Sequence, residues 1–237
     1  MTQKSITSLI SNFVICAVVV IIFVFSFSPS EIAVSSNNSP INKGESDTKV
    51  SLMVNVYWGT EYIPQMLDIF DAYNAKTTFF VGGMWAAENE EMLKEIHSRG
   101  HEIGNHGYYH KDHKQIDYNR NKQEIEITHK VVKEILGVDM TLFAPPSGSY
   151  GDTTLTVASE LGYKTIMWTL DTIDWRDQDE AVIFSRATEK ISGGAMVLMH
   201  PTKATVAALD DILQAINKKG LSVSTVSEVI EPLQVNI

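Results

Sequence analysis

Apolar and polar residues alternate in blocks along most of the chain, and the blocks predict strands and helices in regular succession. Short apolar runs, typical of buried strands, occupy residues 49–58, 76–83, 101–106, 141–146, 163–170, 193–200 and 221–226. The stretches between them are amphipathic or largely polar, and they predict helices at residues 61–75, 87–100, 118–136, 152–162, 179–191 and 204–220. The first of these helices shows the period clearly. Its apolar face carries Ile63, Met66, Leu67, Phe70 and Tyr73.

The succession of elements predicts the fold class. Strand and helix alternate about seven times, which favours parallel strands with helices outside them, in a (β/α) barrel or an open doubly wound sheet. Polar or turn residues fall at the carboxyl ends of the predicted strands, and they are Asn55, His106, Pro145, Asp171, Asp174 and His200. Because the strands of a barrel all point the same way, these residues would meet at one rim. The sequence therefore favours a barrel with an enzyme-like site.

The N-terminal part predicts a membrane segment. Residues 9–27 are almost wholly apolar, carry no charge and are just long enough to cross a bilayer core as one helix. A cleaved signal peptide is the alternative, with a small-residue cleavage site at residues 33–35. We interpret residues 1–27 as an anchor or signal segment, residues 28–48 as a flexible linker rich in Ser, Asn and Pro, and residues 49–237 as one domain.

Composition excludes several kinds of site. The chain has 237 residues, a net charge of −10 and a single cysteine, Cys16, which lies in the apolar run. Disulfide bonds, a cysteine-ligated zinc site and a cysteine nucleophile are therefore excluded. The negative charge disfavours nucleic acids and anionic lipid surfaces, which attract basic patches. A neutral or amino-sugar glycan is the easier partner.

The segment HEIGNHGYYH, residues 101–110, contains the clearest candidate for a metal site. His106 and His110 leave the same short stretch, and neutral imidazoles are ligands for zinc, cobalt or nickel. The alternative is that both are polar loop residues without a metal. The other histidines are expected in solvated helices or loops, and they are His97, His101, His113 and His129.

Five segments together resemble a known family. They are TTFFVGG, GHEIGNHGYYH, FAPPSGSY, TLDTIDW and VLMH. In order and spacing they are similar to the motifs of NodB-type polysaccharide deacetylases, carbohydrate esterase family 4, over roughly residues 49–235. The resemblance implies a distorted barrel of about seven strands. It also implies a divalent metal and the removal of N- or O-acetyl groups from chitin, peptidoglycan, xylan or related polymers.

The family's first motif, T-F-D-D-G, is degenerate in this chain. In the matching stretch MVNVYWG, Asn55 stands where the resemblance places the general base and Val56 where it places a ligand aspartate. The Trp-Gly pair resembles a sporulation-associated, PdaB-like branch, which also lacks the second aspartate but keeps the first. Ala144 replaces the arginine that would orient the base. An amide cannot accept a proton at neutral pH, so we expect a rate lower by roughly 10²–10⁴-fold, although Asn55 could still offer a metal its oxygen.

The acid side of the expected site is complete. By the same resemblance, His200 is the acid that protonates the departing amine, Asp174 is the aspartate beside it, and Trp175 lines the acetyl pocket. Read without the family, His200 is an ordinary strand-end histidine and Trp175 a core aromatic residue. The other substrate-binding residues expected from these motifs are Pro145, Tyr150 and Leu198.

Two functions fit these residues. One is a weak N-deacetylase that acts on peptidoglycan or a chitin-like glycan through a water activated by zinc, cobalt or nickel. The other is a catalytically inactive, membrane-tethered glycan-binding or scaffold protein of the cell wall or spore. The complete acid side favours the first. In either case a single-pass anchor in the cell membrane would hold the domain on the extracytoplasmic side, with cleavage and secretion as the alternative.

Overall fold

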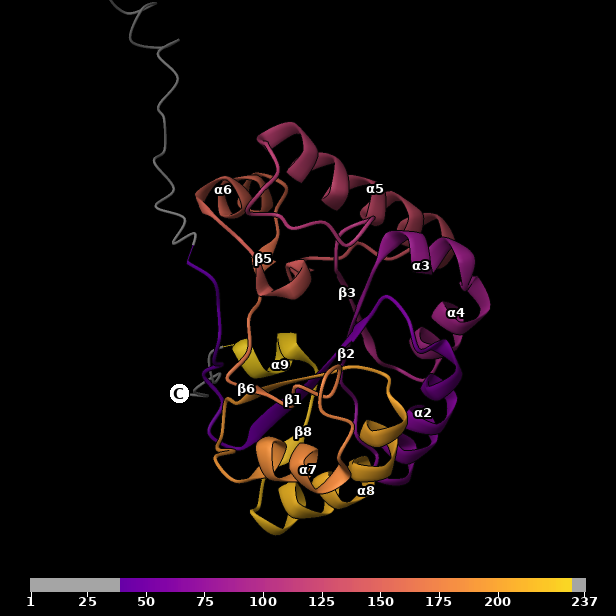
Figure 1. The fold of residues 1–237 in the computed structure, drawn as a ribbon, viewed down its shortest axis with the longest axis vertical. Coiled ribbons are helices and arrows are strands. Elements are labelled where there is room, and N and C mark those ends of the chain that lie inside the picture. The colour runs from indigo at the N-terminus through magenta and orange to yellow at the C-terminus, as the bar shows by residue number, and fades with distance from the viewer. Residues whose placement is uncertain (1–38, 232–237) are drawn as a thin grey trace, which may run out of the picture. The chain divides into compact units, whose positions relative to one another are not determined.

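The structure is a computed structural model, and it describes residues 39–231, drawn in colour in Figure 1. Eight parallel strands form one sheet in this part of the chain. They are β1 (Lys49–Val56), β2 (Thr78–Val81), β3 (Glu102–Asn105), β4 (Leu142–Phe143), β5 (Lys164–Thr165), β6 (Leu170–Asp171), β7 (Met196–Met199) and β8 (Ser222–Val223).

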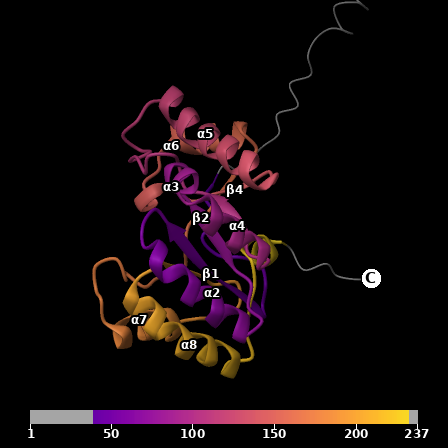
Figure 2. The same ribbon diagram turned by 90° about the vertical axis from the view of Figure 1, so that its right-hand side faces the viewer.

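Most helices connect these strands on the outside of the sheet, whereas the last helix follows the last strand and packs into the cluster of Met53 and Phe80. The helices are α2 (Ile63–Ala72), α3 (Gly83–Glu88), α4 (Glu90–Ser98), α5 (Tyr118–Leu136), α6 (Asp152–Glu160), α7 (Glu180–Thr188), α8 (Lys203–Lys218) and α9 (Val226–Ile230), with short 3₁₀ turns η1 (Thr60–Tyr62) and η2 (Pro146–Gly148). Figures 1 and 2 show α2, α7 and α8 as one group of neighbouring helices and α3, α5 and α6 as another.

The strand order confirms the predicted parallel sheet but corrects the predicted barrel. The order is β5-β4-β3-β2-β1-β7-β6, with β8 beside the start of β1. Within residues 39–231, β5 and β6 end the sheet without pairing with each other, so the sheet is a half-barrel. The strands β4, β5 and β6 have two residues each, too few to build a continuous ladder of hydrogen bonds around a closed barrel.

Strand β1 decides which side chains face the inside of the half-barrel. Leu52 and Val54 belong to the core between sheet and helices, whereas Met53 belongs to a second, smaller core with Phe80. Successive side chains of a strand point to opposite faces, so Asn55, two residues after Met53, shares the inner face. The alternation of side chains along β1 therefore places the polar side chain of Asn55 on the inner face, at the carboxyl end of the strand.

The segment before β1 is part of the fold, which corrects the predicted boundary of the linker. Ile41 N–H donates to Thr165 O at 2.9 Å, and Ile41 O accepts from Met167 N–H at 2.8 Å. Further on, Gly44 N–H donates to Gly194 O at 2.8 Å. Folded structure therefore begins before Lys49, because this segment forms backbone hydrogen bonds with the edge strand β5 and the residues that follow it.

The described residues contain no helix long and apolar enough to cross a membrane. The predicted anchor, residues 9–27, lies outside them, and it stays a prediction.

Candidate functional site

A pocket of about 350 Å³ opens at the carboxyl ends of the parallel strands. Its lining residues are Asn55, Tyr57, Trp58, His106, His110, Ser147, Trp168, Asp171, Trp175, Leu198 and His200. Six residues named from the sequence for metal binding, catalysis or substrate contact are among them. Pro145 and Tyr150, predicted to bind substrate, are not: Pro145 is buried and Tyr150 is half-buried elsewhere.

The two candidate metal ligands lie on the loop that follows β3. The ring centroids of His106 and His110 are 5.1 Å apart, with their planes at 71°. His106 Nδ1 is 2.7 Å from Ala144 O, and because a carbonyl oxygen only accepts, Nδ1 carries the proton. This fixes the tautomer and leaves Nε2 of His106 with a free lone pair.

Both imidazoles are held in the neutral form that binds metals. Burial lowers the pKa of His106 well below its usual value, and the neighbouring His110 lowers it further. Burial also lowers the pKa of His110. Each ring therefore keeps a lone pair over the physiological pH range, which suits coordination rather than salt-bridge formation.

A buried carboxylate of α5 holds the loop between the two histidines. Glu124, 1% exposed, accepts the backbone N–H of Tyr108 at 2.8 Å and of Tyr109 at 2.6 Å. Its second oxygen pairs with Arg120 at 2.7 Å. The anchorage matters because His110 has a φ of 53°, a left-handed conformation that a residue with a side chain adopts only when its surroundings enforce it. Sequence reasoning missed Glu124, since nothing local relates it to the loop.

Asn55 supplies a third candidate ligand. It is 4% exposed, and its Oδ1 is buried without a hydrogen-bond partner. A buried amide oxygen left without a donor is destabilising unless a water or an ion meets it. Residues 39–231 contain no group of three or more His, Cys, Asp or Glu side chains able to hold a metal. Two imidazole nitrogens and one orphaned amide oxygen nevertheless fit a divalent metal, with water completing the shell.

The structure brings Asp174 and His200 together as the sequence predicted. Asp174 is fully buried, and its Oδ1 lies 2.8 Å from His200 Nδ1, so the imidazole donates. The other oxygen accepts the backbone N–H of His200 at 2.6 Å and the hydroxyl of Thr205 at 2.5 Å. Three donors hold the carboxylate in place. His200 Nε2 is left free at the pocket, where it can take up a proton and pass it on.

Two tryptophans of the pocket are unusually exposed. Trp175 is 56% exposed, so the alternative that it is a core residue is wrong. Trp58 is 45% exposed and its ring stacks on His200, with centroids 5.8 Å apart and planes at 7°. Sequence reasoning gave Trp58 no role of its own, although the Trp-Gly pair after the first strand was a visible signal.

The pocket contains no arginine or lysine. Ala144, which stands where the resemblance expects an arginine, is fully buried in the inner core beside Phe80 and Ile166. Its backbone carbonyl still serves the site by accepting from His106. The side of the site that would orient a carboxylate base is therefore apolar.

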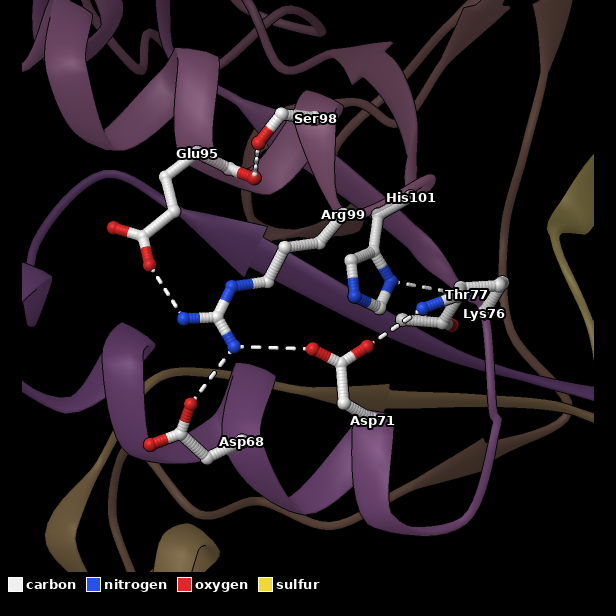
Figure 3. Close-up of polar contacts among 8 residues, drawn as sticks. All are labelled: Asp68, Asp71, Lys76, Thr77, Glu95, Ser98, Arg99 and His101. Atoms are coloured by element: carbon white, nitrogen blue, oxygen red, sulfur yellow. Dashed lines mark hydrogen bonds and ion pairs between the residues drawn. The ribbon is translucent and has the colours of Figure 1, made fainter.

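Two histidines expected in solvent are in fact buried. His101 is 2% exposed between Phe70 and Phe79, and Figure 3 shows its Nδ1 facing Thr77, whose N–H it accepts at 3.2 Å. His113 is fully buried and donates to Asn121 Oδ1 at 2.7 Å. Neither lines the pocket, and the sequence pattern around them does not distinguish them from exposed His97.

A half-barrel of parallel strands, with a histidine pair and an Asp-supported histidine lining one pocket at its carboxyl rim, is an arrangement suited to a hydrolase. Residues 42–166, just over half of the chain, match the family model Polysaccharide deacetylase, and the chain belongs to this family. This confirms the family predicted from the motifs. The family's enzymes hydrolyse N-acetyl groups of amino-sugar glycans and generally use a divalent metal.

The similar proteins include a deacetylase, an uncharacterized protein and a protein described as a pseudoenzyme. The uncharacterized protein YlxY of Bacillus subtilis (strain 168) is 39% identical over 204 residues, which cover 86% of this chain and 64% of YlxY. A peptidoglycan-N-acetylglucosamine deacetylase of Bacillus cereus is 34% identical over 179 residues, covering 71% of this chain and 82% of that protein.

A solved structure with the same fold is that of a CE4 family pseudoenzyme from Bacillus anthracis. It has a TM-score of 0.80 and 36% identity, covering 82% of this chain and 69% of that chain. A mutant of that protein is described as having restored enzymatic activity. Its structure has a TM-score of 0.80 and 34% identity, covering 82% of this chain and 72% of the mutant chain.

Proposed function

We propose that this protein is a deacetylase-like hydrolase that acts weakly on N-acetyl groups of an amino-sugar glycan, peptidoglycan in the first place. The observation that carries the proposal is one pocket lined by the histidine pair His106 and His110 and by His200, whose ring is hydrogen-bonded to buried Asp174. The first pair suits a metal, and the second suits protonation of a departing amine. The peptidoglycan deacetylase among the relatives supports the choice of polymer.

His106, His110 and Asn55 are the residues that would hold the metal. When bound, a divalent metal supplies Lewis acidity, which polarises an acetyl carbonyl and lowers the pKa of water. The chain's own part is to keep two imidazoles neutral and to present the unpartnered oxygen of Asn55. The family context supports a metal, while its identity as zinc, cobalt or nickel is part of the proposal.

His200, once Nε2 has taken up the proton released by the attacking water, would pass it to the amine as the C–N bond breaks. Asp174 fixes the proton on Nδ1 and holds the ring, so Nε2 is the atom that faces the substrate. Trp175 and Leu198 line the same pocket and would contact the acetyl group and the sugar. The acid half of the reaction is therefore complete in this chain.

The base half is not complete, and this is why we propose weak hydrolysis. Asn55 cannot take a proton from water, and no arginine enters the pocket to orient a replacement carboxylate. Loss of a general base lowers a rate by roughly 10²–10⁴-fold, or about 3–5.5 kcal/mol of barrier.

The second candidate function is a non-catalytic glycan-binding or scaffold protein. Asn55 and Ala144 favour it, because together they remove the base and the residue that orients it. The similarity to the pseudoenzyme from B. anthracis supports it too. Its exposed tryptophans would suit glycan binding without hydrolysis. Either proposal includes three further expectations. The protein would belong to the PdaB-like branch, would act in sporulation, and would be anchored in the cell membrane with its domain outside.

Acetate release from peptidoglycan fragments and chitooligomers separates the two functions. We expect slow release by the parent chain, faster release by Asn55→Asp, and the fastest by Asn55→Asp with Ala144→Arg, because the guanidinium would orient the new carboxylate. Ala144→Arg alone would bury an unpaired charge and should destabilise the fold. Adding His200→Ala should remove the gain.

The recovered activity of the pseudoenzyme mutant supports this design. If no variant releases acetate while the parent binds the oligomers, the binding function is correct. If the parent is active and Asn55→Asp slows it, the account of a missing base is wrong, because the amide then serves the reaction better than a carboxylate does.

A further inference from the structure

The imidazole of His200 is fixed firmly at one end only. Nδ1 donates to Asp174, whereas Nε2 has no hydrogen-bond partner among the described residues. The terminal torsion of a histidine has a broad energy well, so one hydrogen bond leaves the ring free to tilt about that contact. A group that donates a proton needs its ring held in one plane.

Trp58 covers one face of this ring. The two rings are nearly parallel, at 7°, with their centroids 5.8 Å apart. An offset parallel arrangement is one of the favoured geometries for aromatic pairs, and it becomes stronger when one ring is cationic. The ring of Trp58 has no other aromatic contact in residues 39–231, and 45% of the residue is exposed. Core packing therefore does not explain its position.

The glycine after Trp58 explains how the indole reaches His200. Gly59 has a φ of 79°, and a Cβ at this position would lie 2.1 Å from Pro201 O and 3.0 Å from Pro201 Cγ. Only glycine allows this turn to press against the turn that follows His200. Tyr62 N–H then donates to Gly59 O at 3.0 Å, which fixes the turn. The two residues thus act together. Gly59 allows the backbone to come close to Pro201, and Trp58 places its flat ring against His200.

We propose that Trp58 is the positioning residue of His200, confining the imidazole to the plane in which Nδ1 meets Asp174. The inference deepens the proposed function, since it concerns the residue proposed as the acid. The test does not measure hydrolysis, so it can be carried out even if the protein has no deacetylase activity. Failure of acetate release would count against the proposed function and leave the position of His200 unaffected.

Solvent exchange of the His200 Nδ1–H, followed by NMR of the ¹⁵N-labelled full-length chain, tests the proposal. Trp58→Leu, which keeps an apolar side chain but removes the flat ring, should speed exchange by roughly three- to tenfold. Trp58→Phe should restore most of the protection. The matched control is Trp175→Leu, the same replacement at the other exposed tryptophan, which should leave exchange at the parent rate. The Nδ1–H of buried His113 serves as an internal reference.

Parent-like exchange in Trp58→Leu would overturn the proposal, and so would an equal effect of Trp175→Leu. An equal acceleration in Trp58→Phe and Trp58→Leu would also overturn it, because bulk rather than a flat face would then matter. Should Trp58→Leu fail to fold, Trp58→Met gives the same comparison with a flexible apolar side chain.

Discussion

Buried His101 makes the stability of this protein depend on pH over a defined window. Burial, with a smaller contribution from nearby Lys76, lowers the pKa of His101 to about 4. Figure 3 shows the cations Lys76 and Arg99 near the ring, and the ion pairs of Arg99 with Asp68 and Asp71. A proton would have to enter at Nδ1, which already accepts the N–H of Thr77.

The sign and size of the effect follow from linkage. In the unfolded chain a histidine has a pKa of about 6.5, so the unfolded state binds the proton first as the pH falls. Between pH of about 6.5 and about 4, the free energy of unfolding therefore drops by about 1.4 kcal/mol for each pH unit. The whole window is worth about 3 kcal/mol, a large part of the stability of a small domain. The contribution is fully present above the window and lost below it.

The variant His101→Asn isolates this contribution. The asparagine Oδ1 can still accept the Thr77 N–H, but the residue does not titrate. It should be less stable at pH 7, because the ring no longer packs against Phe70 and Phe79. Its stability should nevertheless fall less steeply toward pH 4. Urea unfolding followed by circular dichroism across this range measures both slopes.

The other buried histidines, His106 and His113, are present in both parent and variant. Their contribution to the pH dependence therefore cancels in the comparison. The same replacement at exposed His97 is the control, and it should leave the parent curve unchanged. Parallel curves for parent and His101→Asn would refute the reasoning, since His101 would then titrate alike in the folded and unfolded chains.

Two further predictions concern the segment before β1 and the anchored loop. A chain that begins at residue 49 should be less stable by about 2 kcal/mol or more than one that begins at residue 39, because it lacks the backbone hydrogen bonds of Ile41 and its neighbours. Equal unfolding midpoints would contradict this. Glu124→Gln should weaken Zn²⁺ or Co²⁺ binding, measured by calorimetry, by roughly tenfold, because the loop loses its charged anchor. Glu126→Gln, on the same helix but more exposed, is the control, and equal affinities for both variants would count against the anchor.

The sequence was sufficient for features that depend on local periodicity and on strand direction. Alternation of apolar runs and amphipathic stretches predicted the parallel sheet, because each period reflects which face of an element is buried. It also placed Asn55, His106 and His200 at one rim, since parallel strands carry their carboxyl ends to the same edge. The pocket contains all three.

Closure of the sheet and burial of single residues depended on tertiary packing. The barrel remained a half-barrel because β5 and β6 pair only with β4 and β7 and not with each other, which the apolar run 163–170 does not reveal. His97 and His101 lie in one stretch of sequence, yet one is exposed and the other is enclosed by Phe70 and Phe79. Which of them is buried depends on side chains more than twenty residues away in sequence.

The residues that position the site were likewise decided only by the tertiary structure. Glu124 reaches the backbone of Tyr109 from a helix fifteen residues further along the chain, and Trp58 stacks on a histidine at the far end of the domain. Such contacts arise where separate elements pack, and no local pattern encodes them. The sequence therefore determined which chemical groups lie at the rim, whereas tertiary packing determined which of them are fixed in position by contacts with other elements.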